Sequence, residues 1–120
     1  MAKKVKPGMS AKDIATLHYE LALEGNKEEW AKTIKKSYRD RLDDRAVSPY
    51  YWWKTSQRYK DQYGYSYTFK LKDERQSSDT HIKFFFHRLN NQGEKQGQVP
   101  IHIIKDKDDN DEWRVDVSSW

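Results

Sequence analysis

Two histidines on neighbouring predicted strands are the first residues whose type and spacing could do chemistry. If the connecting loop is centred between Glu94 and Lys95, antiparallel pairing places His87 opposite His102. Two adjacent imidazoles could begin a metal site, but a catalytic zinc ion needs a third protein ligand, and none is evident at a suitable spacing. We therefore expect no metal and no cofactor. We interpret the pair as exposed on the outer sheet face or as a pH-responsive part of an interface.

The acidic loop DKDDNDE has the start of a calcium-binding pattern. Asp106, Asp108 and Asn110 occupy positions 1, 3 and 5 of an EF-hand loop. Asp111 stands where that loop needs glycine, and Val117 stands where it needs a bidentate glutamate. Because the flanking segments IHII and WRVDV have strand patterns, we predict a hairpin turn that binds no calcium.

No set of side chains has the spacing of a catalytic site. The acids cluster in predicted turns and on helix exteriors, and Asp116 alternates away from Trp113, Val115 and Val117. There is no Ser/His/Asp arrangement, glycine-rich phosphate loop or zinc spacing, and the chain has no cysteine for a disulfide or a nucleophile. We predict no catalytic residues.

Four consecutive aromatic residues in SPYYWWKTSQRY surround a predicted helix. At 100° per residue, Trp52, Tyr59 and Tyr63 lie on one face, which is predicted to be the core face. Tyr51 and Trp53 point to its two sides, and Tyr50 lies nearly opposite. One packed face cannot bury all four, so flank packing, a cavity mouth and a dimer contact remain open as explanations.

Composition and charge favour a single folded domain with a short basic tail. The 120 residues contain five Trp, eight Tyr and four Phe, which predicts a core made of a few large rings. Three of the 23 Lys and Arg residues lie in residues 1–9, interpreted as a flexible basic tail, whereas all 19 acidic residues follow them. The remainder, 10–120, is therefore nearly neutral, and nucleic acid is not expected to be a partner. No apolar run could span a membrane or serve as a secretory signal, so the chain as written is expected to be soluble and cytoplasmic; an excised exported domain is the alternative.

Hydrophobic periodicity predicts three helices followed by four strands. Ser10 and Gly25 bound the first helix, whose apolar face includes His18, expected to be a hydrogen-bonded core residue. The second helix carries Trp30, Ile34, Tyr38 and Leu42 every four residues, and Ser48 and Pro49 begin the third. After Gly64, residues Tyr65, Tyr67, Phe69 and Leu71 alternate with polar residues as a strand with one buried face. The predicted helices are 10–24, 26–44 and 48–63, and the predicted strands are 65–72, 80–89, 98–105 and 112–119.

Helices followed by an antiparallel meander predict an α+β fold with the helices on one sheet face. The segments LHYELALEGNKEEWAKTI and DNDEWRVDVSSW resemble the opening helical hairpin and the closing strand of nuclear transport factor 2-like (cystatin-like, SnoaL-like) domains. The resemblance covers most of residues 10–120 and implies one cone-shaped domain. In one departure, RAVSP leaves little room for the short strand that this family often places before its third helix.

The resemblance implies two kinds of candidate site. Many such domains enclose a pocket between the helices and a curved sheet, and many dimerise through the outer sheet face. The candidate pocket residues are Trp30, Tyr38, Trp52, Tyr59, Tyr67, Phe69, Phe84 and Phe86. The candidate interface residues are Phe85, His87, His102 and Ile104.

We expect a non-catalytic domain that forms a homodimer or binds a small apolar or aromatic ligand. The alternative function, which also comes from the resemblance, is a small-molecule isomerase or cyclase of the ketosteroid isomerase or polyketide cyclase type. That chemistry requires a titratable base in an apolar pocket, and His87 or His102 could serve only if their face is the concave one.

Overall fold

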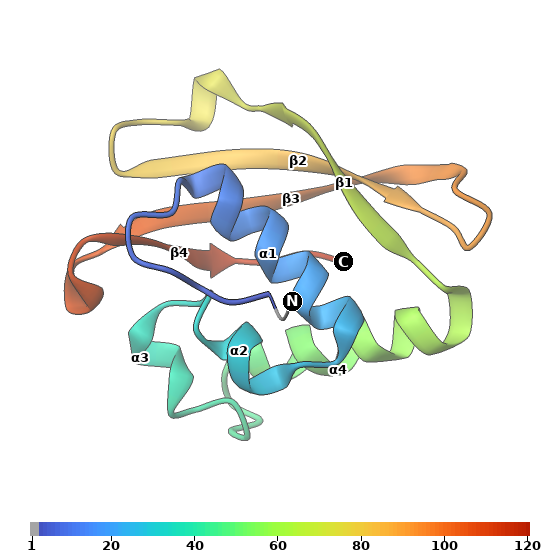
Figure 1. The fold of residues 1–120 in the computed structure, drawn as a ribbon, viewed down its shortest axis with the longest axis horizontal. Helices are drawn as coiled ribbons and strands as arrows, with labels where there is room; N and C mark the ends of the chain where they lie inside the picture. Colours follow the sequence, from blue (N-terminus) through green and yellow to red (C-terminus); the bar gives the residue numbers. More distant parts are fainter. Residues whose placement is uncertain (1–2) are drawn as a thin grey trace.

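A four-stranded antiparallel sheet carries the helices on one face (Figure 1). The strands pair in chain order, so the sheet is a meander, and the predicted α+β class is confirmed. The computed structural model describes residues 3–120. The helices are α1 (Ala11–Glu24), α2 (Lys27–Ala31), α3 (Lys36–Arg39) and α4 (Ser48–Tyr63), the strands are β1 (Ser66–Lys72), β2 (His81–Leu89), β3 (Lys95–Asp106) and β4 (Glu112–Val117), and two 3-10 turns are η1 (Glu74–Gln76) and η2 (Lys107–Asp109).

Helix α1 forms where the sequence predicts it and packs across the sheet. The Ser10 hydroxyl accepts a hydrogen bond from the Asp13 backbone N–H at 3.1 Å, which caps the first turn. Gly25 ends the helix with φ of 73°, a left-handed conformation that glycine adopts without strain. The face that includes Ile14 and Leu21 is fully buried.

The predicted continuous helix 26–44 is wrong. Helix α2 ends at Ala31, and the chain then extends so that Ile34 forms an isolated parallel bridge with Val115 of β4. The Val115 N–H donates to the Thr33 carbonyl at 2.7 Å, and the Lys35 N–H donates to the Val115 carbonyl at 3.1 Å. The bridge satisfies backbone groups on the β4 edge, and the β-branched residues Thr33 and Ile34 favour an extended chain. The short extended segment therefore lies at Ile34, before α3.

Helix α4 buries less of its aromatic surface than predicted. It begins at Ser48, with Val47 at the N-cap position, so Ser48 lies inside the helix and does not cap it. The predicted core residue Tyr63 is 49% exposed. The helix is tied to α1 where the Gln57 amide donates to the Ala22 carbonyl at 2.8 Å, and beyond this point α4 extends past the end of α1 (Figure 1). Its last turns therefore lack a covering layer.

The β2–β3 hairpin turns earlier than predicted, which changes the pairing of the histidines. His87 lies opposite Gln98, and Phe84 lies opposite Ile101, so the predicted pairing of His87 with His102 is wrong. The Asn90 side chain accepts hydrogen bonds from the backbone N–H groups of the loop, at residues 92 and 94, each at 2.9 Å. Gly93 adopts φ of 80°, so the loop closes around it and every later pair shifts.

Two register shifts also change which side chains face solvent. The β1–β2 register shifts between Phe69 and Leu71, and the β3–β4 register shifts at His102 and Ile103. A bulge breaks strict alternation, so residues beyond it change faces. Leu71 and Val117, predicted to lie on buried faces, are each 43% exposed.

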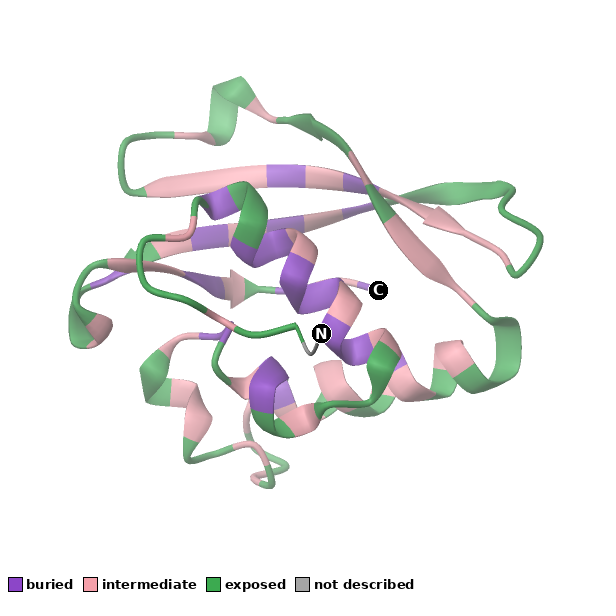
Figure 2. Cartoon of the chain, viewed as in Figure 1, coloured by how far each residue is buried: buried purple, intermediate pink, exposed green. Residues whose placement is uncertain are grey.

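The core lies between α1 and the sheet and is rich in aromatic rings. Figure 2 shows buried residues on α1 and along the middle of β2 and β3, whereas α4 is mostly intermediate or exposed. The largest fully buried side chains include Trp30, Tyr19 and Phe86. No helix among residues 3–120 is long and apolar enough to cross a membrane.

Candidate functional site

The eight predicted pocket residues separate into two groups. On the helices, Trp30 contacts Trp53 with ring centroids 5.1 Å apart, and Tyr38 contacts Trp52 at 6.0 Å. On the sheet, Phe69 packs against Phe84 and Phe86 at 5.6 and 5.8 Å. Trp30, Phe84 and Phe86 are buried in the core, whereas Tyr38, Trp52, Tyr59, Tyr67 and Phe69 are partly buried against it.

His18 occupies the interior between the two groups. Its ring lies 5.2 Å from Trp30 and 5.3 Å from Trp120. Its Nδ1 lies 2.8 Å from the Thr33 hydroxyl, and its Nε2 lies 2.9 Å from the Ser118 hydroxyl. Because the Thr33 hydroxyl already donates to the Trp30 carbonyl, it accepts from Nδ1–H, and Nε2 accepts from Ser118. His18 is the predicted hydrogen-bonded core residue.

The environment of His18 keeps its ring neutral. Complete burial lowers its pKa to about 3, because desolvation disfavours the imidazolium. With both nitrogens engaged and the ring neutral, His18 has no free lone pair with which to accept a substrate proton.

Three unpaired polar atoms meet near the C-terminus. The Tyr67 hydroxyl, the Arg88 Nε and the Trp120 Nε1 are buried and have no hydrogen-bond partner among the described residues. Tyr67 and Arg88 are cross-strand neighbours, the Arg88 Nη1 donates to the Trp120 carbonyl at 3.2 Å, and the rings of Tyr67 and Trp120 lie 5.7 Å apart. Burial raises the pKa of Tyr67 well above its ordinary value, so its hydroxyl stays protonated. Each of the three groups is therefore a buried hydrogen-bond donor without an acceptor among the described residues.

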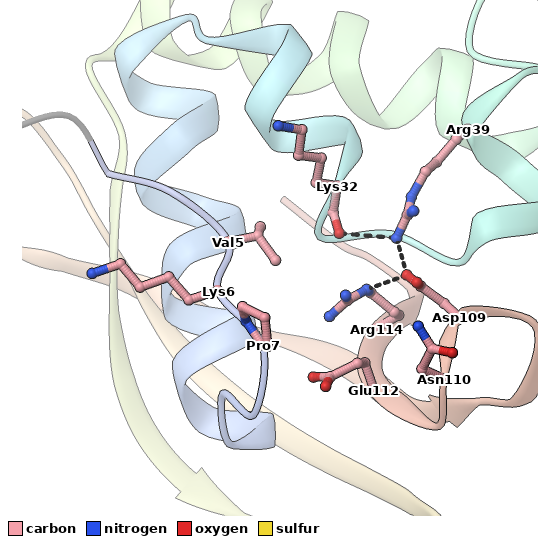
Figure 3. A pocket seen from close by; sticks show the side chains of 9 residues that line it. All are labelled: Val5, Lys6, Pro7, Lys32, Arg39, Asp109, Asn110, Glu112 and Arg114. Atoms are coloured by element: carbon pink, nitrogen blue, oxygen red, sulfur yellow. Dashed lines mark hydrogen bonds and ion pairs between the residues drawn. The ribbon is translucent and has the colours of Figure 1, made fainter.

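Three surface pockets lie outside both aromatic groups. The first, about 280 Å³, lies between the N-terminal segment, α3 and the β3–β4 hairpin (Figure 3). The second, about 580 Å³, includes His81 and Ile104, and the third, about 420 Å³, lies along α2 and α3. None of the eight predicted pocket residues lines any of the three.

The first pocket is lined by charges that already satisfy one another. Arg39 and Arg114 both donate to one carboxylate oxygen of Asp109, the latter at 2.7 Å, and Glu112 accepts from the Gly8 N–H. In Figure 3 the Lys6 and Lys32 side chains point away from this pair of arginines. Burial opposes ionisation of Asp109, but the two arginine hydrogen bonds outweigh it and lower the pKa of Asp109. We interpret the cluster as ion pairs that hold α3 against the β3–β4 hairpin. The acidic loop predicted to be a turn is the turn of this hairpin.

The N-terminal residues that the structure describes are held against the domain. The Val5 N–H donates to Glu29 at 2.9 Å, Val5 packs against the core, and Lys3 forms an ion pair with Glu20. The sequence did not predict these contacts, because they depend on acidic side chains brought together by the fold. Residues 1 and 2 of the predicted tail lie outside the described range.

The outer face of the sheet carries a second candidate site. Three rows cross it: Leu71, Phe85 and Pro100 pair across β1–β3, Lys83, His102 and Val117 pair across β2–β4, and His81 pairs with Ile104. We call the six residues Leu71, Phe85, Pro100, His102, Ile104 and Val117 the outer-face patch. Each has intermediate or full exposure, and they alternate with buried Phe84, Phe86, Ile101 and Ile103.

The predicted interface residues lie on this face, and four others were not predicted from the sequence: Leu71, Pro100, Val117 and His81. Phe85, His102 and Ile104 belong to the patch, while His87 lies further along β2, opposite Gln98. Leu71 and Val117 were missed because their bulges could not be read from alternation. His81 was missed because its contact with His102 depends on the corrected register.

His81 and His102 form a hydrogen-bonded pair on the outer face. The His81 Nε2 lies 2.8 Å from the His102 Nδ1, and the rings are nearly perpendicular at 83°. Burial, followed by the neighbouring His81 and Lys83, lowers the pKa of His102. Among residues 3–120 no group of three or more potential ligands could hold a metal ion within one chain.

No protein-family model matches the sequence, and no curated protein matches it at a significant level. The α+β class therefore depends on the observed architecture, and function has to be inferred from the geometry of the interior and the outer face.

Proposed function

We propose that the chain is a non-catalytic assembly domain of the nuclear transport factor 2-like kind, which forms a homodimer through the outer face of its sheet. The observation that carries the proposal is the outer-face patch, a largely apolar surface that crosses all four strands on the face opposite the buried core. Apolar area removed from water is the main driving force of association, and contiguous exposed apolar patches mark interaction sites.

The size of the face can be compared with that of a typical dimer interface. The nine residues of β2 span roughly 30 Å at about 3.3 Å per residue, and four strands about 4.8 Å apart add roughly 15 Å. A standard interface buries about 800 Å² per partner, which is about a tenth of the 7031 Å² surface of the chain. These dimensions give a flat area of roughly 450 Å², so the strands supply about half of such an interface and the side chains and loops at their edges would supply the rest.

The charges on this face are compatible with contact between identical copies. Lys83 lies 3.7 Å from Asp73, and Lys35 lies 2.7 Å from Asp116. These pairs neutralise the face within each chain, so two copies can approach without strong like-charge repulsion. A two-fold axis would place the same patch on both sides of the interface.

Replacing Phe85 with glutamate tests the interface. The substitution places a charge on β2, one of the two central strands that carry the patch. We expect the molecular mass from light scattering to fall to that of one chain. The matched control is Tyr51→Glu, because Tyr51 is 51% exposed on α4, far from the patch. Val117→Arg serves as a second interface variant, and a native circular dichroism spectrum verifies folding. An unchanged dimer mass in both folded interface variants would reject this interface.

The unpaired donors of Tyr67, Arg88 and Trp120 favour a second function, binding of a small aromatic or apolar ligand that carries an acceptor group. A buried donor without a partner costs about 1–3 kcal/mol, so an acceptor at this place would be bound favourably. A fluorescence-detected screen of aromatic carboxylates, with Tyr67→Phe as the variant, tests it: binding should weaken in the variant, and equal affinity would reject the site.

The isomerase alternative receives no support from the interior. It needs a free base near an apolar pocket, and the buried imidazole, His18, has both nitrogens hydrogen-bonded. His87 and His102 lie on β2 and β3 outside the helix-covered face, where they could not act on a ligand in the interior.

A further inference from the structure

The His81 and His102 pair has nearly the spacing of two ligands to one metal ion. The facing nitrogens, His81 Nε2 and His102 Nδ1, are 2.8 Å apart. Zinc binds imidazole nitrogen at about 2.0–2.1 Å, so two nitrogens at a tetrahedral angle lie about 3.3 Å from each other. The pair needs to open by only about half an ångström, which small side-chain rotations provide. A metal ion would then replace the proton that the two nitrogens share.

One chain cannot complete this site. The described residues contain no group of three or more potential metal ligands, whereas zinc sites with protein ligands use three or four. Any further protein ligands would therefore come from outside the described part of this chain. Neutral imidazole suits zinc, copper and nickel, and it does not suit magnesium or calcium, which prefer oxygen.

His102 belongs to the outer-face patch and His81 lies beside it, so a second copy docked on this face would bring its own two imidazoles. His102 lies in the middle row, between the row of Phe85 and the row of Ile104, on the central strand β3. In an interface with two-fold symmetry, residues at the centre of the patch meet their own copies. Two pairs that meet at the axis provide four imidazoles.

The neighbouring charges allow a cation at this place. Lys83 is directly opposite His102, but it is turned toward Asp73 at 3.7 Å and lies over the Phe85 ring at 4.8 Å. Asp116, which also acts on His102 electrostatically, is paired with Lys35 at 2.7 Å. These two ion pairs each balance, while Lys105, Lys107 and Asp111 line the pocket that includes His81 and leave one positive charge in excess there.

We propose that His81 and His102 of two chains together bind one divalent transition-metal ion, zinc or a metal of similar ligand preference, at the two-fold axis of the homodimer. The proposal deepens the assembly function and rests on it. The metal would link the two sheets, and the side chains of the outer-face patch would surround the site and exclude water from it.

Sedimentation with and without zinc chloride tests the metal site on the full chain. Two samples are compared, one treated with EDTA and one given zinc at half the chain concentration. We expect the dimer dissociation constant to be lower in the zinc sample by about tenfold or more. A competition assay with a chromophoric zinc chelator should give one zinc per two chains. Magnesium chloride is the control metal and should change neither result.

Matched histidine variants separate the metal site from the interface itself. His81→Gln should abolish the zinc effect and the stoichiometry while a zinc-independent dimer remains. His102→Gln should also abolish the zinc effect, and His87→Gln should behave as the unmodified chain. A dimer that zinc does not tighten would overturn the metal inference and leave the assembly function intact. A single-chain mass under all conditions would overturn both. A zinc effect that persists in His102→Gln would also overturn the inference, because the metal would then bind elsewhere.

Discussion

Acidification between pH 7 and pH 5 should destabilise this protein through His18. Burial lowers the pKa of His18 to about 3 in the folded chain, whereas an unfolded chain has a histidine pKa of about 6.5. Below pH 6.5 the unfolded state therefore binds a proton that the folded state does not. Stability that is present above pH 6.5 is lost as the pH falls toward 3.

The magnitude follows from the difference between the two pKa values. Each pH unit between them costs about 1.4 kcal/mol of unfolding free energy, so the change from pH 7 to pH 5 costs roughly 2 kcal/mol from this residue. Partly buried carboxylates such as Asp109 contribute little in this window, because the pKa of Asp109 is lowered from a value that is already near 4. The window from pH 7 to pH 5 therefore reports mainly on histidine.

Urea unfolding at pH 7, 6 and 5 measures the effect. The free energy of unfolding should fall in the unmodified chain, and His18→Gln, which cannot titrate but retains a donor and an acceptor, should show a smaller fall by roughly 2 kcal/mol. The comparison variant is His87→Gln: desolvation and the neighbouring Lys95 and Lys70 lower the pKa of His87 in the folded chain, but His87 is not in the core, so its removal should reduce the pH dependence less than His18→Gln does. Equal pH dependence in His18→Gln and the unmodified chain would refute the assignment of a buried neutral imidazole.

Two further substitutions, measured by urea unfolding, test the end of α4 and the Asp109–Arg114 ion pair. Gly64→Ala should lower the free energy of unfolding by about 1–2 kcal/mol. Gly64 has φ of 65°, and an added Cβ would lie 2.8 Å from the Cβ of Asn91. An unchanged free energy of unfolding would show that the end of α4 is arranged differently. Asp109→Asn should lower the free energy of unfolding by roughly 3 kcal/mol, because it leaves the buried Arg114 without its carboxylate partner. A decrease below about 1 kcal/mol would contradict the structural role of this ion pair.

Local signals explain which elements the sequence could predict. Helix α1 has a serine cap and a terminal glycine, and both act through neighbouring backbone, so its limits are predictable. The spacing of four residues from Trp30 to Leu42 is typical of one continuous helix. The extended chain at Ile34 is nevertheless more stable, because it forms backbone hydrogen bonds with the edge of β4. These bonds depend on a strand about eighty residues further along the chain, which no local pattern contains.

The outer-face patch was predictable in part. Phe85 and Ile104 follow from alternation within runs that are apolar on both sides. Leu71 and Val117 depend on bulges, and the His81 contact depends on a hairpin that closes around Gly93. Each of these is a shift of one or a few residues in pairing, and such a shift changes which side chains meet without changing the hydrophobic pattern of the sequence.

Sedimentation equilibrium of the unmodified chain at neutral pH tests the assembly function most directly. We predict a mass twice the 14.5 kDa of one chain, with dissociation on dilution, and loss of the dimer in Phe85→Glu but not in Tyr51→Glu. A mass of one chain at all accessible concentrations, with and without zinc, would contradict it.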